Sequence, residues 1–301
     1  MVSVDFNNDY QRYDSRHILD LYIGFNDDKR PSLMLVTPQA ISGSVATKLS
    51  SSAFINVRLG RRQMDGRYAL EFILTDDAYK ELFDKFCEDL AESSRSVSSE
   101  EDGPSFLAER YSLWRTMFRN SNKGRLSELE IKGLIGELVF LSRYMFEEYG
   151  VDEALSAWCG PDGVDQDFRI GDYWYEVKAV NAGKETVHIS SVEQLDTVSD
   201  GELVAVRVEQ TSNSDFNGVT LNGLVASIRG QLSGNVASFD QCLLKHNYVS
   251  LSEYDNMYFR IYGYERYAIT KVAPVLRSGN ITAAATHVQY DLALSMLERL
   301  S

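Results

Sequence analysis

The sequence predicts a mixed α/β (α+β) protein with two parts. The first 75 residues hold short runs rich in Val, Ile, Phe and Tyr, which are typical of β-strands. Residues 126–149 carry the strongest helical pattern in the chain, with apolar side chains every three or four positions. Three strands, a short helix and a further strand are predicted between residues 166 and 209. This αβββαβ order predicts helices packed on a sheet.

The first part is predicted to be a small α+β module over residues 1–104. Its strands are expected at 31–36, 53–59 and 67–74, and a helix at 78–90 would bury Leu82, Phe83, Phe86 and Leu90. The Ser- and Glu-rich segment 91–104 is interpreted as a linker, although a solvated surface loop explains it equally well. The second domain is expected over residues 105–301. It would begin with a helix at 106–118 that buries Leu107, Tyr111, Trp114 and Phe118.

Composition limits the classes of function. The chain has 301 residues, of which 44% are hydrophobic and 25% charged, so it can form a sizeable core. Its net charge of −14 argues against a protein that coats nucleic acid non-specifically. No apolar run could cross a bilayer, and no signal peptide is recognised at the start. The cysteines (Cys87, Cys159 and Cys242) show no zinc spacing and no plausible disulfide framework, which predicts a reduced, cytoplasmic protein.

Residues 165–178 predict a tight β-hairpin. Gly171 and Asp172 match a two-residue type II′ turn, so Ile170 would pair with Tyr173. Counting outward from this turn, Asp167 faces Glu176. Because side chains alternate along a strand, one face of the hairpin would carry these polar residues: Asp165, Asp167, Glu176 and Lys178.

Two carboxylates opposite each other on a β-ladder repel, so stability alone does not explain this pairing. A divalent cation such as Mg²⁺, bound between Asp167 and Glu176, would remove the repulsion. Lys178 could then hold a water molecule or neutralise a phosphate. The alternative is a solvated polar face with an ion pair between Asp165 and Lys178.

A further carboxylate is expected beside this hairpin. Glu137 lies within the apolar stripe of the long helix, where an unpaired charge is rarely tolerated. Gly133 and Gly136 would let another element approach the helix next to it. The sequence therefore predicts a buried Glu137 that faces the hairpin, and the alternative is a Glu at the edge of the stripe that reaches solvent.

Together these residues resemble the PD-(D/E)XK nuclease superfamily, whose fold is restriction-endonuclease-like. The ordered set is Glu137 on a helix, Asp167, and then Glu176-Val177-Lys178. Further strings are similar to a PD-(D/E)XK family found beside methyltransferases and ATPases in restriction and phage-defence gene clusters. These strings are Gly136-Glu137-Leu138-Val139-Phe140-Leu141, Trp158-x-Gly160-Pro161 and Ile189-Ser190-Ser191-x-x-Gln194-Leu195. The resemblance covers residues 126–209 well and the remainder loosely.

The resemblance implies a Mg²⁺-dependent DNA endonuclease in which Mn²⁺ can substitute. Asp167 and Glu176 would bind the metal, with help from the Val177 carbonyl, and Glu137 would hold metal-bound water. Lys178 would position the attacking water, and Gln194 would be the polar residue after the third strand. The chain departs from the family signature because Gln166, not Pro, precedes Asp167. Asp165 therefore stays an alternative ligand.

The resemblance also implies DNA as substrate, defence proteins such as a methyltransferase or an ATPase as partners, and possible oligomers. Two other functions remain open: a catalytically silent nuclease-fold scaffold or regulatory subunit, and an unrelated binding protein. No Walker or dinucleotide-binding pattern is present, so ATP hydrolysis is not expected.

The C-terminal third predicts helices at 221–232 and 236–246, strands at 258–269 and 288–294, and a helical end. Its tyrosines at 258, 262, 264 and 267 could stack on bases, but a half-buried sheet face is the favoured interpretation.

Overall fold

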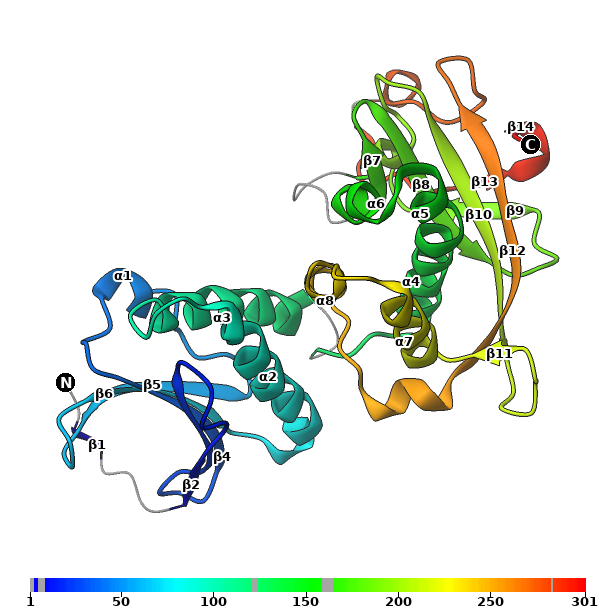
Figure 1. The fold of residues 1–301 in the computed structure, drawn as a ribbon. Helices are drawn as coiled ribbons and strands as arrows, with labels where there is room; N and C mark the ends of the chain where they lie inside the picture. The colour runs from blue at the N-terminus through cyan, green and yellow to red at the C-terminus, as the bar shows by residue number, and fades with distance from the viewer. Residues whose placement is uncertain (1–2, 5–8, 121–123, 159–164, 283) are drawn as a thin grey trace. The chain divides into compact units, whose positions relative to one another are not determined.

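The computed structural model describes residues 3–4, 9–120, 124–158, 165–282 and 284–301. The chain forms two compact units, one of residues 1–125 with 247–249 and the other of residues 126–246 with 250–301. The division falls at Arg125 and Leu126 rather than at 104 and 105, because the helix after the expected linker packs within the first unit. The structure is mixed α/β, as the sequence predicts (Figure 1).

The first unit contains a six-stranded sheet in the order β1-β5-β6-β4-β3-β2. All neighbours in this sheet are antiparallel except β1 and β5. The three strands predicted here are confirmed as β4, β5 and β6. The strands are β1 (Ser3–Val4), β2 (Tyr10–Arg12), β3 (Asp20–Phe25), β4 (Pro31–Thr37), β5 (Ile55–Arg62) and β6 (Tyr68–Leu74).

Helices α2 (Lys80–Ser93) and α3 (Gly103–Asn120) cover one face of this sheet (Figure 1). Aromatic side chains of the helices and the sheet are buried between them. Phe72 of β6 lies 5.3 Å from Phe86, which in turn lies 5.5 Å from Trp114. Both predicted apolar stripes are buried. The expected linker is instead mostly structured, with the end of α2, a 3₁₀ turn at Ser94–Ser96 and the start of α3. The unit also holds α1 (Gly43–Ala46) and a 3₁₀ turn at Asp77–Tyr79.

The second unit begins with the predicted long helix. Helix α4 (Glu128–Phe140) starts at a capping box between Ser127 and Glu130, then continues through a π-helical turn at Leu141–Met145 into α5 (Phe146–Tyr149). Helix α6 (Val151–Trp158) follows. Gly160 and Pro161 of the family string lie outside the described residues. Further on are α7 (Leu221–Gln231) and α8 (Val236–Lys245).

The sheet of the second unit has the order β11-β12-β10-β8-β7, and β14 also pairs with β12. The central strand β10 is parallel to β8 and antiparallel to β12. A separate two-stranded sheet joins β9 to β13. The strands are β7 (Phe168–Ile170), β8 (Tyr173–Val180), β9 (Thr186–Ile189), β10 (Gly201–Thr211), β11 (Gly218–Val219), β12 (Tyr258–Ile269), β13 (Tyr290–Ala293) and β14 (Glu298–Arg299).

Helix α4 covers one face of this sheet, and β9, β13 and their connections cover the other. A Cβ added at Gly136 would lie 3.1 Å from the Cβ of Ala179, so the helix meets β8 closely at this point. Phe140 packs on Tyr175 at 5.3 Å. The opposite face buries a second core that includes Trp174, Val187, Ile189, Leu203 and Ala205.

Three local predictions in this unit are wrong. The helix expected after β9 is a 3₁₀ turn at Val192–Gln194, with no capping box, because Ser190 lies before the turn and its N–H donates to the Gln194 side chain. The expected helical end is a 3₁₀ turn at Leu294–Met296 followed by β14, which gains backbone pairing with β12. Among the cysteines, Cys87 is free and buried, but Cys242 is disulfide-bonded and not reduced.

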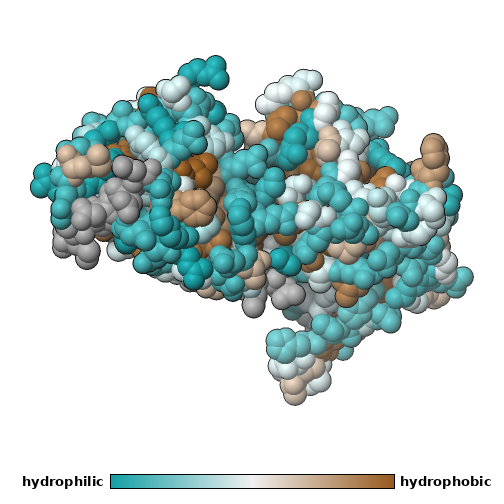
Figure 2. Space-filling model, turned by 90° about the horizontal axis from the view of Figure 1, so that it is seen from below, coloured by the Kyte–Doolittle hydropathy of each residue, from teal (hydrophilic) through white to brown (hydrophobic). Residues whose placement is uncertain are grey.

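Within the described ranges, no helix combines the length and apolar character needed to cross a membrane. Figure 2 shows one face of the molecule, where hydrophilic side chains predominate and apolar side chains are scattered. Of the tyrosines on β12, Tyr267 is buried and Tyr264 packs 5.7 Å from Phe140, as expected for a sheet face.

Candidate active site

The predicted hairpin is present with the predicted register. Phe168 pairs with Tyr175, and Ile170 pairs with Tyr173 across the turn at Gly171 and Asp172. Of the two turn residues only Gly171 has a positive φ, +57°, which agrees with a type II′ turn. Glu176 and Lys178 therefore share one face of β8 with Trp174 and Val180.

The hairpin ladder is short, since β7 pairs with Tyr173–Tyr175 whereas β8 continues along β10 up to Val180. Beyond Tyr175, no described strand pairs with the β7 side of β8, and this part is called the open edge of β8. Asp167 precedes β7 and does not stand opposite Glu176 on the ladder. Its Oδ2 instead accepts a hydrogen bond from the Val177 N–H at 2.7 Å. Because the N–H and C=O of one extended residue point to the same edge, the Val177 carbonyl also faces this open edge.

Glu176 and Lys178 form an ion pair on the buried face of β8. Lys178 Nζ lies 2.7 Å from Glu176 Oε1. Glu176 is 1% exposed, and its other oxygen, Oε2, is buried with no hydrogen-bond partner among the described residues. Such an atom is unusual in a folded protein and calls for an explanation. An ion pair between Asp165 and Lys178, the alternative for this hairpin, is not what the structure shows, since Lys178 pairs with Glu176 and Asp165 is exposed.

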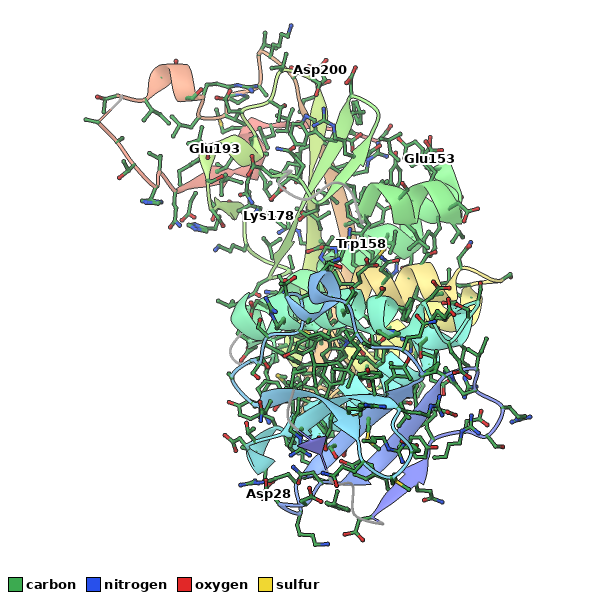
Figure 3. All side chains as sticks on the ribbon, turned by 90° about the vertical axis from the view of Figure 1, so that its left-hand side faces the viewer. Asp28, Glu153, Trp158, Lys178, Glu193 and Asp200 are labelled. Atoms are coloured by element: carbon green, nitrogen blue, oxygen red, sulfur yellow. The ribbon has the colours of Figure 1, made fainter. Side chains whose placement is uncertain are left out.

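Gln194 reaches the same lysine from the 3₁₀ turn after β9. Its Oε1 accepts hydrogen bonds from Lys178 Nζ at 3.1 Å and from the Ser190 N–H at 3.0 Å. Gln166 holds this turn to the hairpin, because its Nε2 donates to the carbonyls of Glu193 and Gln194. Figure 3 labels Lys178 on β8 and Glu193 on this turn.

Glu137 is near the other carboxylates but contacts different residues. Its Oε2 accepts a hydrogen bond from Trp158 Nε1 at 2.8 Å and lies 3.4 Å from His246 Nδ1. Its side chain is 17% exposed, so it is neither fully buried nor freely solvated. Sequence reasoning missed both neighbours. Trp158 belongs to the family string Trp158-x-Gly160-Pro161, which could have indicated that it lies at the site. Nothing in the sequence connects His246 with Glu137.

The three carboxyl groups influence one another. Burial raises the pKa of Glu137 to about 7, and Glu176 adds to the increase. Burial and the charge of Glu137 raise the pKa of Asp167 to about 8. Burial also raises the pKa of Glu176 well above its ordinary value, followed by the charges of Asp167 and, to a lesser extent, Asp165. Each carboxylate is thus destabilised by burial and like charge, as at many functional sites.

These residues fit a hard divalent cation. The donors are carboxylate oxygens, one of them buried and unpartnered, and a cation would counter the like charges. Within the ranges that the structure describes, no three His, Cys, Asp or Glu side chains form a metal-binding cluster by themselves. Mg²⁺ commonly uses one or two carboxylates and takes its remaining ligands from water and substrate.

Comparisons with known proteins agree with this arrangement. The searches of curated proteins and of solved structures gave no match. A family model described as "Putative PD-(D/E)XK family member, (DUF4420)" matches residues 7–295. Because this match spans nearly the whole chain, the protein belongs to that PD-(D/E)XK family, with its nuclease-like fold.

Proposed function

We propose that this protein is a metal-dependent DNA endonuclease that hydrolyses phosphodiester bonds. The observation that carries the proposal is the contact between Lys178, Glu176 and Gln194 beside the open edge of β8. Asp167 is held at that same edge by the Val177 N–H. A partly buried lysine between a carboxylate oxygen of Glu176 and the Gln194 side chain matches the group that a phosphodiesterase needs near the scissile phosphate.

Asp167 and Glu176 are the proposed metal ligands, together with the Val177 carbonyl and with Glu137 nearby. The unpartnered Oε2 of Glu176 supports this assignment, because a cation would satisfy an oxygen that the protein leaves without a partner. When bound, Mg²⁺ or Mn²⁺ would supply Lewis-acid activation of water and neutralise charge on the phosphate.

In the proposed reaction, a water oxygen forms a bond to phosphorus while the bond from phosphorus to the leaving sugar oxygen breaks. Lys178 carries the positive charge that orients this water and stabilises the additional negative charge on the phosphate. Gln194 is proposed to hold the Lys178 ammonium in place through the 3.1 Å hydrogen bond.

The biological setting is proposed to be restriction or phage defence, with a methyltransferase or an ATPase as partner. Charge supports dependence on a partner, since residues 126–301 contain 25 Asp and Glu but only 13 Lys and Arg. DNA is a polyanion, so this unit gains little from long-range attraction.

The test is cleavage of plasmid and linear DNA with Mg²⁺ or Mn²⁺. Glu176→Ala and Lys178→Ala should each abolish metal-dependent cutting, whereas Asp172→Ala, an exposed carboxylate in the same hairpin, should cut like the wild type. Asp167→Asn and Asp165→Asn form a second pair that separates the proposed ligand from its competitor. Cutting that survives in both Glu176→Ala and Lys178→Ala would contradict the proposed site.

The second candidate function is a catalytically silent scaffold or regulatory subunit. The acidic charge favours it. Calorimetry distinguishes the two functions. A wild type that neither cuts DNA nor binds Mg²⁺ or Mn²⁺ would support the scaffold.

A further inference from the structure

Glu137 lies next to two ring side chains at the ends of other helices. Trp158, the last residue of α6, donates its indole N–H to Glu137 Oε2 at 2.8 Å. His246, directly after α8, places Nδ1 3.4 Å from the same oxygen. Neither residue has been assigned a role in the proposed reaction.

The two rings support each other. The imidazole of His246 stacks on the indole of Trp158, with 4.3 Å between ring centroids and 12° between planes. Phe239 of α8 packs on the indole at 6.1 Å, and Trp158 is only 3% exposed. Since both rings are packed, the indole N–H has little freedom to leave its position. Figure 3 labels Trp158 at the end of α6.

The chemistry of this contact suits a carboxylate that must keep its charge. Asp167 and Glu176 repel Glu137, and its side chain could rotate toward solvent because it is partly exposed. A lysine or arginine would hold the group but would also neutralise it. An indole N–H is a neutral donor and therefore fixes the direction of the carboxylate while leaving its charge available to a cation.

We propose that Trp158 is a positioning residue that holds Oε2 of Glu137 and leaves Oε1 available to the divalent cation, and that His246 supports it by stacking on the indole and by donating from Nε2 to the Trp158 carbonyl at 3.4 Å. Among described residues, both recorded polar contacts of this carboxylate are made through Oε2. The inference rests on the proposed function, because it assumes that a cation binds near Glu137.

The test compares two buried indoles in the full-length protein. Trp158→Phe removes the donor to Glu137, whereas Trp174→Phe removes a donor to the Ser199 carbonyl, 3.0 Å away in the core. Calorimetry should show Mn²⁺ and Mg²⁺ binding about 10-fold weaker in Trp158→Phe and within about twofold of wild type in Trp174→Phe. His246→Phe, which retains a stacking ring, should weaken binding less than Trp158→Phe. It also serves as a second variant if Trp158→Phe does not fold.

A spectroscopic measurement gives an answer that does not depend on activity. In ¹⁵N-labelled protein, the indole N–H signal of Trp158 should shift in Glu137→Gln and again when Mg²⁺ is added to the wild type. The signal of Trp174 should stay in place in both experiments.

The outcomes separate this inference from the proposed function. A wild type that binds no metal would overturn both. Metal binding that is weakened by Glu176→Ala but equally strong in Trp158→Phe, His246→Phe and Trp174→Phe would overturn the positioning role alone. Wild-type affinity in Glu137→Gln would also overturn it, since Glu137 would then not serve the cation.

Discussion

Glu176 and Asp167 show how individual residues at this site depart from what stability favours. Glu176 is buried with an oxygen that has no partner among the described residues, and burial together with the charge of Glu137 raises the pKa of Asp167. Proteins tolerate such unfavourable groups mainly where function requires them. The residues of the site should therefore limit the stability of the metal-free protein.

Asp167→Asn should stabilise the metal-free protein by about 1–3 kcal/mol, because it removes a repelled charge while retaining an oxygen for the Val177 N–H. Urea unfolding in the presence of a chelator measures this change. Asp172→Asn, at the exposed turn of the same hairpin, should leave the free energy of unfolding within about 0.5 kcal/mol of wild type. A destabilised Asp167→Asn would show that the charge is not repelled.

The stability of the metal-free protein should also depend on pH. The pKa of Asp167 rises from 3.8 to about 8 on folding, and that of Glu137 from 4.5 to about 7. The folded state therefore binds more protons than the unfolded state, and the free energy of unfolding should fall as pH rises from about 5 to about 8. Thermal melts in a chelator test this slope, which should be shallower in Asp167→Asn. Melting temperatures that climb through this range would refute the assignment.

At the scale of elements, the packing of α4 against β8 brings Glu137 to the site. The sequence suggested that both Gly133 and Gly136 allow close approach. The structure shows this only for Gly136, since a Cβ at Gly133 would meet nothing within 4 Å. Packing against β8 thus explains the glycine at position 136. Gly133 lowers the helix propensity of α4, and no contact explains it.

Gly136→Val should destabilise the protein by about 1–3 kcal/mol, because its side chain would collide with Ala179 of β8. Gly133→Ala should instead stabilise it by about 0.5–1 kcal/mol through helix propensity. Denaturant melts of both variants give the comparison. Equal effects at the two positions would mean that α4 does not approach β8 at Gly136.

Element prediction succeeded where the pattern was local. The turn at Gly171 and Asp172 determined the hairpin register, and the apolar spacing of residues 126–149 indicated α4. Prediction failed for short segments whose local pattern is compatible with more than one structure. The segment after β9 forms a 3₁₀ turn because the Gln194 side chain accepts the Ser190 N–H, which competes with a regular helix start.

At the scale of the whole molecule, the net charge of −14 is concentrated in the nuclease-like unit, where 25 acidic residues outnumber 13 basic ones. The logarithm of DNA affinity falls with the logarithm of salt concentration in proportion to the number of phosphates that lysine and arginine neutralise. An acidic protein acting alone should therefore bind DNA weakly.

We expect the wild type to bind DNA in the presence of Ca²⁺ with a small dependence on salt. The slope of log affinity against log salt concentration should have a magnitude of about 1–3. Lys178→Ala should reduce that slope by about 1, because the proposed function assigns one phosphate contact to Lys178. Lys271→Ala, an exposed lysine in the turn after β12, serves as the control. Fluorescence anisotropy at several salt concentrations supplies the data, and a slope of about 6 or more would mean that an extended basic surface exists.

The sequence by itself determined the fold class, the hairpin register and the shared face of Glu176 and Lys178, because local periodicity and turn chemistry are carried by short stretches of sequence. It also determined the family, through an ordered set of motifs whose resemblance the family model confirms. Only the tertiary structure decided that Asp167 turns to the Val177 N–H, that Gln194 reaches Lys178, and that Trp158 and His246 meet at Glu137. Those contacts join elements far apart in the chain, and their geometry depends on how whole helices and strands pack, which no local pattern encodes.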